Sequence, residues 1–207
     1  MGNDPEPDRT HVKVEQLAAY HNRAAFSCGT PALDDYIRRY ARQNAKRDLS
    51  QCFVLVSQAG DPDIMGYYTL SSYTVETTAL PPTLAQRLPP NILLPATLLG
   101  RMAVDMRYQG QGYGGKLVLH ALRAALRAAH RVASIGVAVD ALNDELVTFY
   151  TKPKLGFVVL LDRPRHLLMP MSRVRAMFPS EAAGLQDVSD LIENASGMTN
   201  QLGEGKR

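Results

Sequence analysis

The sequence has few cysteines and no long apolar run. Its two cysteines, Cys28 and Cys52, lie far apart and form no CxxC pair. This argues against a disulfide scaffold and a cysteine-based zinc site. No stretch reaches the roughly 18 apolar residues of a membrane span, and the polar first ten residues lack the apolar core of a secretory signal. We therefore expect a cytoplasmic protein that binds no membrane and no metal.

Acidic residues are missing from one part of the chain, although the overall charge is close to balanced. The 207 residues carry 23 Lys and Arg against 20 Asp and Glu. Residues 106–139 contain no acid, and a second basic cluster lies within residues 38–47. Two basic surfaces predict an anionic ligand or partner, while solvated helix faces are the alternative. His120, in the acid-free segment, is expected to be an exposed helix residue.

The pattern of apolar residues predicts an α/β (α+β) fold with a mixed, mostly antiparallel central sheet flanked by helices. We expect one domain over residues 11–178, a loose tail at 1–10 and a polar tail at 179–207 that is partly helical or disordered. Helices are predicted at 31–47, 84–87, 112–129 and 143–150. Strands are predicted at 11–17, 52–56, 64–75, 98–104, 133–139, 157–161 and 167–171.

A glycine-rich loop between the strand at 98–104 and the helix at 112–129 is the most informative segment. Glycines occupy positions 110, 112, 114 and 115. They let the backbone approach a ligand closely, and the first N–H groups of the following helix have no intrahelical acceptor. Such a bend is suited to binding phosphate.

Two other interpretations of this loop remain. Gly110, Gly112 and Gly115 match the GxGxxG pattern of dinucleotide-binding folds. Five residues separate these glycines from the strand, and the nearest later acid is Asp140, so a nicotinamide or flavin site is disfavoured. The glycines could also serve only to start the helix.

The loop and its surroundings resemble the Gcn5-related N-acetyltransferases (GNAT). Gln109, Gly112 and Gly114 fit the family signature of Gln or Arg, two residues, Gly, one residue, and Gly or Ala. Residues 26–48, 66–72, 98–105 and 140–157 further resemble the GNAT toxins of type II toxin–antitoxin modules. The resemblance implies acetyl transfer from acetyl-CoA to the α-amino group of aminoacyl-tRNA, which blocks translation. It also implies a ribbon-helix-helix antitoxin as partner and a homodimer.

The resemblance assigns coenzyme A contacts to two stretches of backbone. Met102, Ala103 and Val104 would pair with the pantetheine arm and polarise the thioester. Asn143 either meets coenzyme A or caps the helix that follows it. The residues implied to hold the pyrophosphate are Gln109, Gly110, Gln111, Gly112, Tyr113, Gly114 and Gly115.

Tyr150 matches the tyrosine that would act as general acid. A phenol with an ordinary pKa of about 10 is protonated at neutral pH and can give its proton to a leaving thiolate. The alternative is a buried tyrosine that anchors its helix. Pro153 should end that helix just after Tyr150. No residue is singled out as a base, and Asp105 is expected to fix the end of its strand.

The resemblance also gives a use for the first basic cluster. Its residues would contact the RNA backbone, without reading sequence. A GNAT enzyme acting on a small-molecule or protein amine remains an alternative, as does a non-catalytic acyl-CoA-binding module. The residues assigned to RNA binding are Arg38, Arg39, Arg42, Lys46 and Arg47.

Overall fold

The structure is a computed structural model that describes residues 12–86 and 88–183. Within these residues it contains one seven-stranded sheet with the order β1-β2-β3-β4-β5-β7-β6. All neighbouring strands are antiparallel except β4 and β5, which are parallel and joined through helix α4. This confirms the predicted fold class. The strands are β1 (Lys13–Gln16), β2 (Gln51–Val56), β3 (Gly66–Glu76), β4 (Leu93–Val104), β5 (Gly136–Asp140), β6 (Val158–Val159) and β7 (His166–Pro170).

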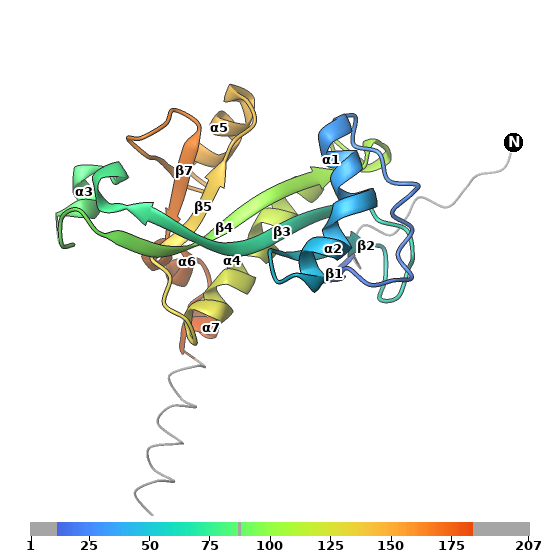
Figure 1. Cartoon of the computed structure of the whole chain (residues 1–207), viewed down its shortest axis with the longest axis horizontal. Helices are drawn as coiled ribbons and strands as arrows, with labels where there is room; N and C mark the ends of the chain where they lie inside the picture. Colours follow the sequence, from blue (N-terminus) through green and yellow to red (C-terminus); the bar gives the residue numbers. More distant parts are fainter. Residues whose placement is uncertain (1–11, 87, 184–207) are drawn as a thin grey trace, which may run out of the picture.

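Helices cover both faces of the sheet (Figure 1). Helix α4 packs with α6 on one face, and α1, η1 and α2 lie on the other. Residues 31–46 form a single helical segment, as predicted, but its centre is a π-helix, η1. The helices are α1 (Pro31–Asp35), η1 (Tyr36–Tyr40), α2 (Ala41–Lys46), η2 (Thr77–Ala79), α3 (Pro82–Ala85), η3 (Met106–Tyr108), α4 (Tyr113–Ala129), α5 (Asp144–Thr151), α6 (Met171–Met177) and α7 (Pro179–Ala183).

The main core lies between α4 and the sheet. Leu117, Ala121, Leu122 and Ala125 recur at helical spacing on α4, and all four are 0% exposed. Each fully buried leucine contributes about 1.5–3 kcal/mol relative to an exposed one. This apolar stripe therefore holds α4 firmly against β3 and β4, and so fixes the position of the bend from which the helix starts.

The C-terminal part of the described chain differs from the sequence-based expectation. Helix α6 was not predicted, whereas α7 lies in the segment 179–207 that was predicted to be partly helical or disordered. Glu181 of α7 forms ion pairs with Arg123 and Arg127 of α4, with N–O distances of 2.6 and 3.2 Å. Two basic residues of the acid-free segment therefore share one carboxylate of α7. The predicted ends of the chain, 1–10 and 184–207, lie outside the described residues.

His120 is not the exposed helix residue that the sequence suggested. It is half-buried, and its Nδ1 lies 2.7 Å from the hydroxyl of Tyr68. The ring of Phe53 stacks on that of Tyr68, with a centroid distance of 5.1 Å. The prediction was wrong because β2 and β3 place two aromatic rings beneath this turn of α4, which the sequence of the helix alone does not reveal.

Strands β4 and β5 separate soon after they meet. They pair only at Thr97 with Val137 and at Leu98 with Ala138. Beyond these pairs, β4 continues to Val104 and stays bonded to β3 on its other edge. The edge of β4 that faces β5 therefore carries unpaired backbone groups from about Leu99 onward, and these groups can accept a ligand that runs alongside the strand.

Candidate active site

The glycine bend is an open cradle of backbone at the start of α4. Gly110 and Gly112 have φ angles of 75° and 83°, which favour glycine, and Gly112 is the N-cap of the helix. A Cβ built on Gly112, Gly114 or Gly115 would meet no atom within 4 Å. The first hydrogen bond of the helix is donated by the backbone N–H of Lys116 to the carbonyl oxygen of Gly112 over 3.3 Å. The bend thus has unfilled space above N–H groups that lie at the positive end of the helix dipole, and these features fit a diphosphate.

The side chain of Gln109 braces this bend. Its amide donates to the carbonyl oxygens of Val104 and Cys28 over 2.9 and 3.0 Å. Beside it, the buried carboxylate of Asp105 accepts hydrogen bonds from the backbone N–H of Ser27 and from Arg107. Asp105 therefore fixes the strand end, as expected. The side chain of Gln109 therefore stabilises the bend through these two hydrogen bonds. Only the backbone of Gln109 remains a candidate for contact with coenzyme A.

Asp105 should matter for stability in a pH-dependent way. Burial acts to raise the pKa of its carboxyl, but the hydrogen bonds from Arg107 and Ser27 outweigh it and hold the pKa below its ordinary value. We expect Asp105→Asn to lower the free energy of unfolding at pH 7 by about 1–3 kcal/mol. Because the folded-state pKa is depressed, the advantage of the wild type is full above the ordinary pKa of about 4 and fades as the pH falls below it.

Urea unfolding of both proteins at pH 7 and pH 3 checks this. Glu145→Gln, at an exposed position in the first turn of α5, serves as a charge-matched control. Equal midpoints for wild type and Asp105→Asn at pH 7 would contradict the assignment.

Tyr150 is held near the end of α5 by aromatic packing. Its ring lies between Phe149 and Phe157, at centroid distances of 5.2 and 5.1 Å, and the residue is 4% exposed. Helix α5 begins because Asn143 caps it, accepting a hydrogen bond from the N–H of Leu146 over 2.9 Å. The helix ends at Thr151, as Pro153 predicts. The side chain of Asn143 thus follows the capping interpretation.

The hydroxyl of Tyr150 reaches a cavity although its ring is buried. It has no hydrogen-bond partner among the described residues. It is also not one of their fully buried polar atoms without a partner, so the oxygen keeps some exposure. Burial raises the pKa of this phenol above its ordinary value, so it stays protonated through the neutral range. Such a group can donate a proton but cannot serve as a base at neutral pH.

The cavity lies where β4 and β5 separate, between α1 and α5. Its volume is 420 Å³, and its walls include Leu33, Arg101, Met102, Val139 and Tyr150. The structure therefore brings Met102 and Tyr150, two of the predicted site residues, to one cavity. Arg101 was not predicted as a site residue. The sequence carries no local signal for it, because what opens the cavity beside Arg101 is the separation of β4 from β5.

Comparison with known proteins decides the family. The sequence model of the Acetyltransferase (GNAT) family matches residues 15–157. The chain belongs to this family. Among curated relatives, the tRNA-acetylating toxin of Mycobacterium tuberculosis is 34% identical over 153 residues, which cover 74% of this chain and 88% of the relative. The predicted family resemblance is therefore confirmed.

Two solved GNAT toxin structures share the fold. AtaT complexed with acetyl-methionyl-tRNAfMet is 29% identical, with a TM-score of 0.74, and covers 81% of this chain and 99% of its own. A tyrosine-to-phenylalanine variant of AtaT bound to the C-terminus of the antitoxin AtaR and acetyl-CoA is 26% identical, with a TM-score of 0.69, and covers 81% of this chain and 98% of its own.

The basic residues predicted to bind RNA do not form one uniform free surface in this GNAT protein. The guanidinium of Arg38 donates to the carbonyl of Phe26 over 2.6 Å, and Arg39 pairs with Asp35 at 3.3 Å. Within the described chain, no ion pair engages the other three predicted residues. These are Arg42, Lys46 and Arg47.

The described residues contain no group of three or more His, Cys, Asp or Glu side chains placed to hold a metal ion. Among the helices in the same residues, none is long and apolar enough to cross a membrane.

Proposed function

We propose that this GNAT protein transfers the acetyl group of acetyl-CoA to the α-amino group of aminoacyl-tRNA, and that it acts as the translation-blocking toxin of a toxin–antitoxin system. The observation that carries the proposal is the cavity at the separation of β4 and β5, which both Tyr150 and Arg101 line. Its volume of 420 Å³ is typical of a small-molecule site. The relatives named for tRNA acetylation support the choice of acceptor.

The glycine bend and β4 would position the acetyl donor. Backbone N–H groups of residues 109–115 would bind the pyrophosphate in the open space beside the glycines. The edge of β4 at Met102, Ala103 and Val104, which β5 leaves unpaired, offers hydrogen bonds to the pantetheine arm and to the thioester oxygen. Donors fixed in this way stabilise the negative charge that develops on that oxygen during attack.

Tyr150 would complete the transfer as general acid. The neutral amine attacks the thioester carbon, the C–N bond forms and the C–S bond breaks. The leaving thiolate takes the proton of the Tyr150 hydroxyl, and the proton lost by the amine returns the hydroxyl to its starting state by way of solvent. Free α-amino groups titrate near pH 8, so a sizeable neutral fraction exists without a dedicated base.

The partners follow from the same proposal. The AtaT variant solved with its antitoxin supports a cognate antitoxin for this chain. We propose a ribbon-helix-helix antitoxin and a homodimer, acting in the cytoplasm, where charged tRNA is found. Residues 11–178 would form the catalytic domain.

Acetylation of charged tRNA tests the proposal directly. Purified protein is incubated with acetyl-CoA labelled in the acetyl group and with a mixture of aminoacyl-tRNAs. We expect label on the α-amino group of at least one aminoacyl-tRNA and none on uncharged tRNA. Absence of tRNA labelling together with rapid acetylation of a polyamine would replace the toxin function by a small-amine acetyltransferase.

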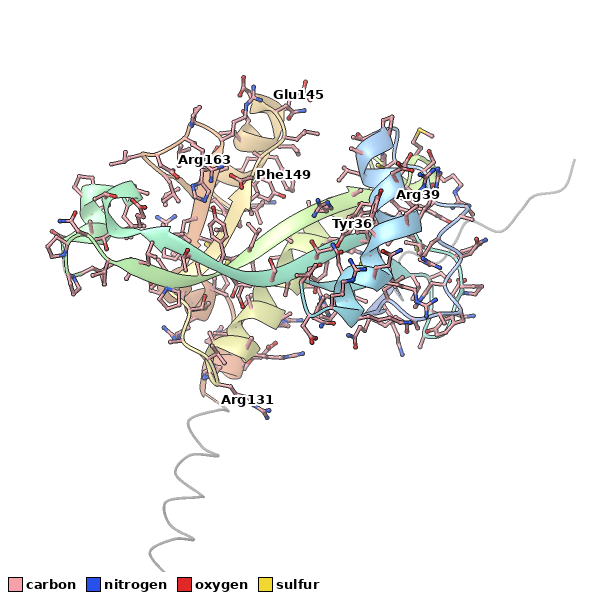
Figure 2. All side chains as sticks on the ribbon, in the orientation of Figure 1. Tyr36, Arg39, Arg131, Glu145, Phe149 and Arg163 are labelled. Carbon is pink, nitrogen blue, oxygen red and sulfur yellow. The ribbon has the colours of Figure 1, made fainter. Side chains whose placement is uncertain are left out.

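The basic residues on α2 give a separate prediction. We expect the double variant Arg42→Gln, Arg47→Gln to weaken tRNA binding and to reduce the slope of log affinity against log salt by about one unit per lost phosphate contact. Filter binding between about 50 and 300 mM salt measures the slope, because the screening of exposed charges strengthens over this range. Arg131→Gln, beyond the end of α4 opposite the bend, is the control for loss of a positive charge elsewhere and should leave the slope unchanged (Figure 2). A slope equal to that of the wild type would remove these residues from the RNA surface.

A further inference from the structure

Arg101 is a charged residue of the cavity that the mechanism above does not use. It lies on β4, next to Met102, and its side chain is exposed. Its guanidinium carbon lies 4.1 Å from the ring centre of Tyr36. This places a cation against an aromatic face in the wall of the cavity that holds the Tyr150 hydroxyl.

The surface on which the guanidinium rests is rigid. Tyr36 is 3% exposed, and its hydroxyl lies 3.0 Å from that of Ser50. Its ring stacks on Tyr67, with a centroid distance of 6.3 Å. The backbone N–H of Arg101 itself donates to the hydroxyl of Thr69 over 3.0 Å. The guanidinium is therefore held in place before any ligand arrives, which reduces the entropy lost on binding.

Among the described residues, the charge of Arg101 has no acidic partner. No carboxylate of the described residues lies within ion-pair distance of it, whereas Asp140, the acid of the same cavity, is paired with Arg163 at 3.3 Å. In Figure 2, Arg163 lies beside β7, whereas Tyr36 lies farther along the β3–β4 ribbon. The cavity thus presents one uncompensated cation whose planar N–H groups suit a phosphate or a carboxylate.

The position of Arg101 decides which anion it meets. Arg101 and Ala103 point to the face covered by α1 and η1, while Met102 and Val104 pack in the core beneath α4. The glycine bend belongs to α4, so the coenzyme pyrophosphate would lie toward the other face. The α-carboxyl group of an aminoacyl-tRNA is esterified, so the anion that all such acceptors share is the phosphate of the RNA backbone.

We propose that Arg101 binds the phosphate of the 3′-terminal nucleotide of the acceptor and so positions the aminoacyl amine beside Tyr150. This inference rests on the proposed function. Arg101 is a positioning residue: it touches the substrate away from the reacting atoms and fixes how far the ester extends into the cavity.

A pair of small acceptors that differ only by that phosphate tests the role. The acceptors are an aminoacyl ester of adenosine and the same ester of adenosine 5′-monophosphate. For the wild type we expect kcat/KM to be about 10–100-fold higher for the phosphorylated acceptor, the scale of one charge-assisted hydrogen-bonded contact. For Arg101→Gln we expect the ratio of kcat/KM between the two acceptors to fall to about one, and for Arg101→Lys we expect an intermediate ratio.

The controls separate this role from fold and from function. Arg131→Gln removes the same charge far from the cavity and should keep the full preference (Figure 2). Equal melting temperatures exclude misfolding of the Arg101 variants. An Arg101→Gln enzyme that keeps the preference, or that loses activity equally on both acceptors, overturns the phosphate contact while acetylation by the wild type stands. A wild type that acetylates neither these esters nor aminoacyl-tRNA overturns the proposed function, and this role with it.

Discussion

Tyr150→Phe is expected to lower kcat for acetyl transfer by about 100-fold or more, with little change in KM for acetyl-CoA. The substitution removes one hydroxyl and leaves the ring between Phe149 and Phe157. Because that hydroxyl has no partner among the described residues, its removal leaves no unsatisfied group in them. The folded structure should therefore keep its melting temperature while the departing thiolate loses its proton donor.

The pH profile gives a second check on the same residue. Burial raises the pKa of Tyr150 above its ordinary value, so ionisation of the phenol should not reduce wild-type activity up to about pH 9. Activity should instead rise with pH as the acceptor amine loses its proton. Tyr20→Phe, which removes the hydroxyl of an exposed tyrosine, is the control. Full activity of Tyr150→Phe would leave Tyr150 as a helix anchor and favour the non-catalytic acyl-CoA-binding alternative.

Gly114→Asp is expected to weaken acetyl-CoA binding by at least about 100-fold, because a carboxylate would occupy the space above the amides of the bend. The same substitution should not destabilise the fold. Gly114 lies in the first turn of α4, where an acidic side chain is favourable to the helix dipole and any residue other than glycine or proline improves helix propensity. Affinity and stability should thus move in opposite directions.

Gly114→Ala is the matched control for this experiment. The added methyl group meets no atom within 4 Å, and alanine is allowed at this position of the family signature. We expect unchanged affinity and a melting temperature slightly above that of the wild type. Calorimetric titration with acetyl-CoA and thermal unfolding of both variants provide the measurements. Tight binding by Gly114→Asp would show that the diphosphate lies elsewhere.

Much of the fold could be predicted from local pattern. The stripe Leu117, Ala121, Leu122 and Ala125 predicts a helix buried on one face, and that is how α4 packs. Features that depend on distant partners could not be predicted in this way. The ion pairs that Glu181 forms across to α4 join segments more than 50 residues apart, and the contact of His120 with Tyr68 joins a helix to a strand with a sequence separation of 52.

The candidate site was predictable only in part. The glycine spacing and the resemblance led to the bend and to Tyr150, which lines the cavity, and the roles of both in the reaction stay predictions. Whether a basic residue is free or paired depends on three-dimensional neighbours. Arg39 has Asp35 one helical turn away, whereas Arg101 has an aromatic ring and no acid. The sequence alone treats these two arginines alike.

The π-helical turn at Tyr36–Tyr40 has a consequence for how length changes in this segment would be tolerated. The N–H of Ala41 donates to the carbonyl of Tyr36, five residues back, so one extra residue is absorbed without breaking the helix. Deleting one residue within this turn would restore regular α-helix and leave the residues on either side facing as they do now. Asp34 and Ala41, which are 7% and 0% exposed, would both stay buried. A one-residue deletion inside the turn should therefore disturb the packing less than one elsewhere in a regular helix, where every downstream side chain turns by about 100°.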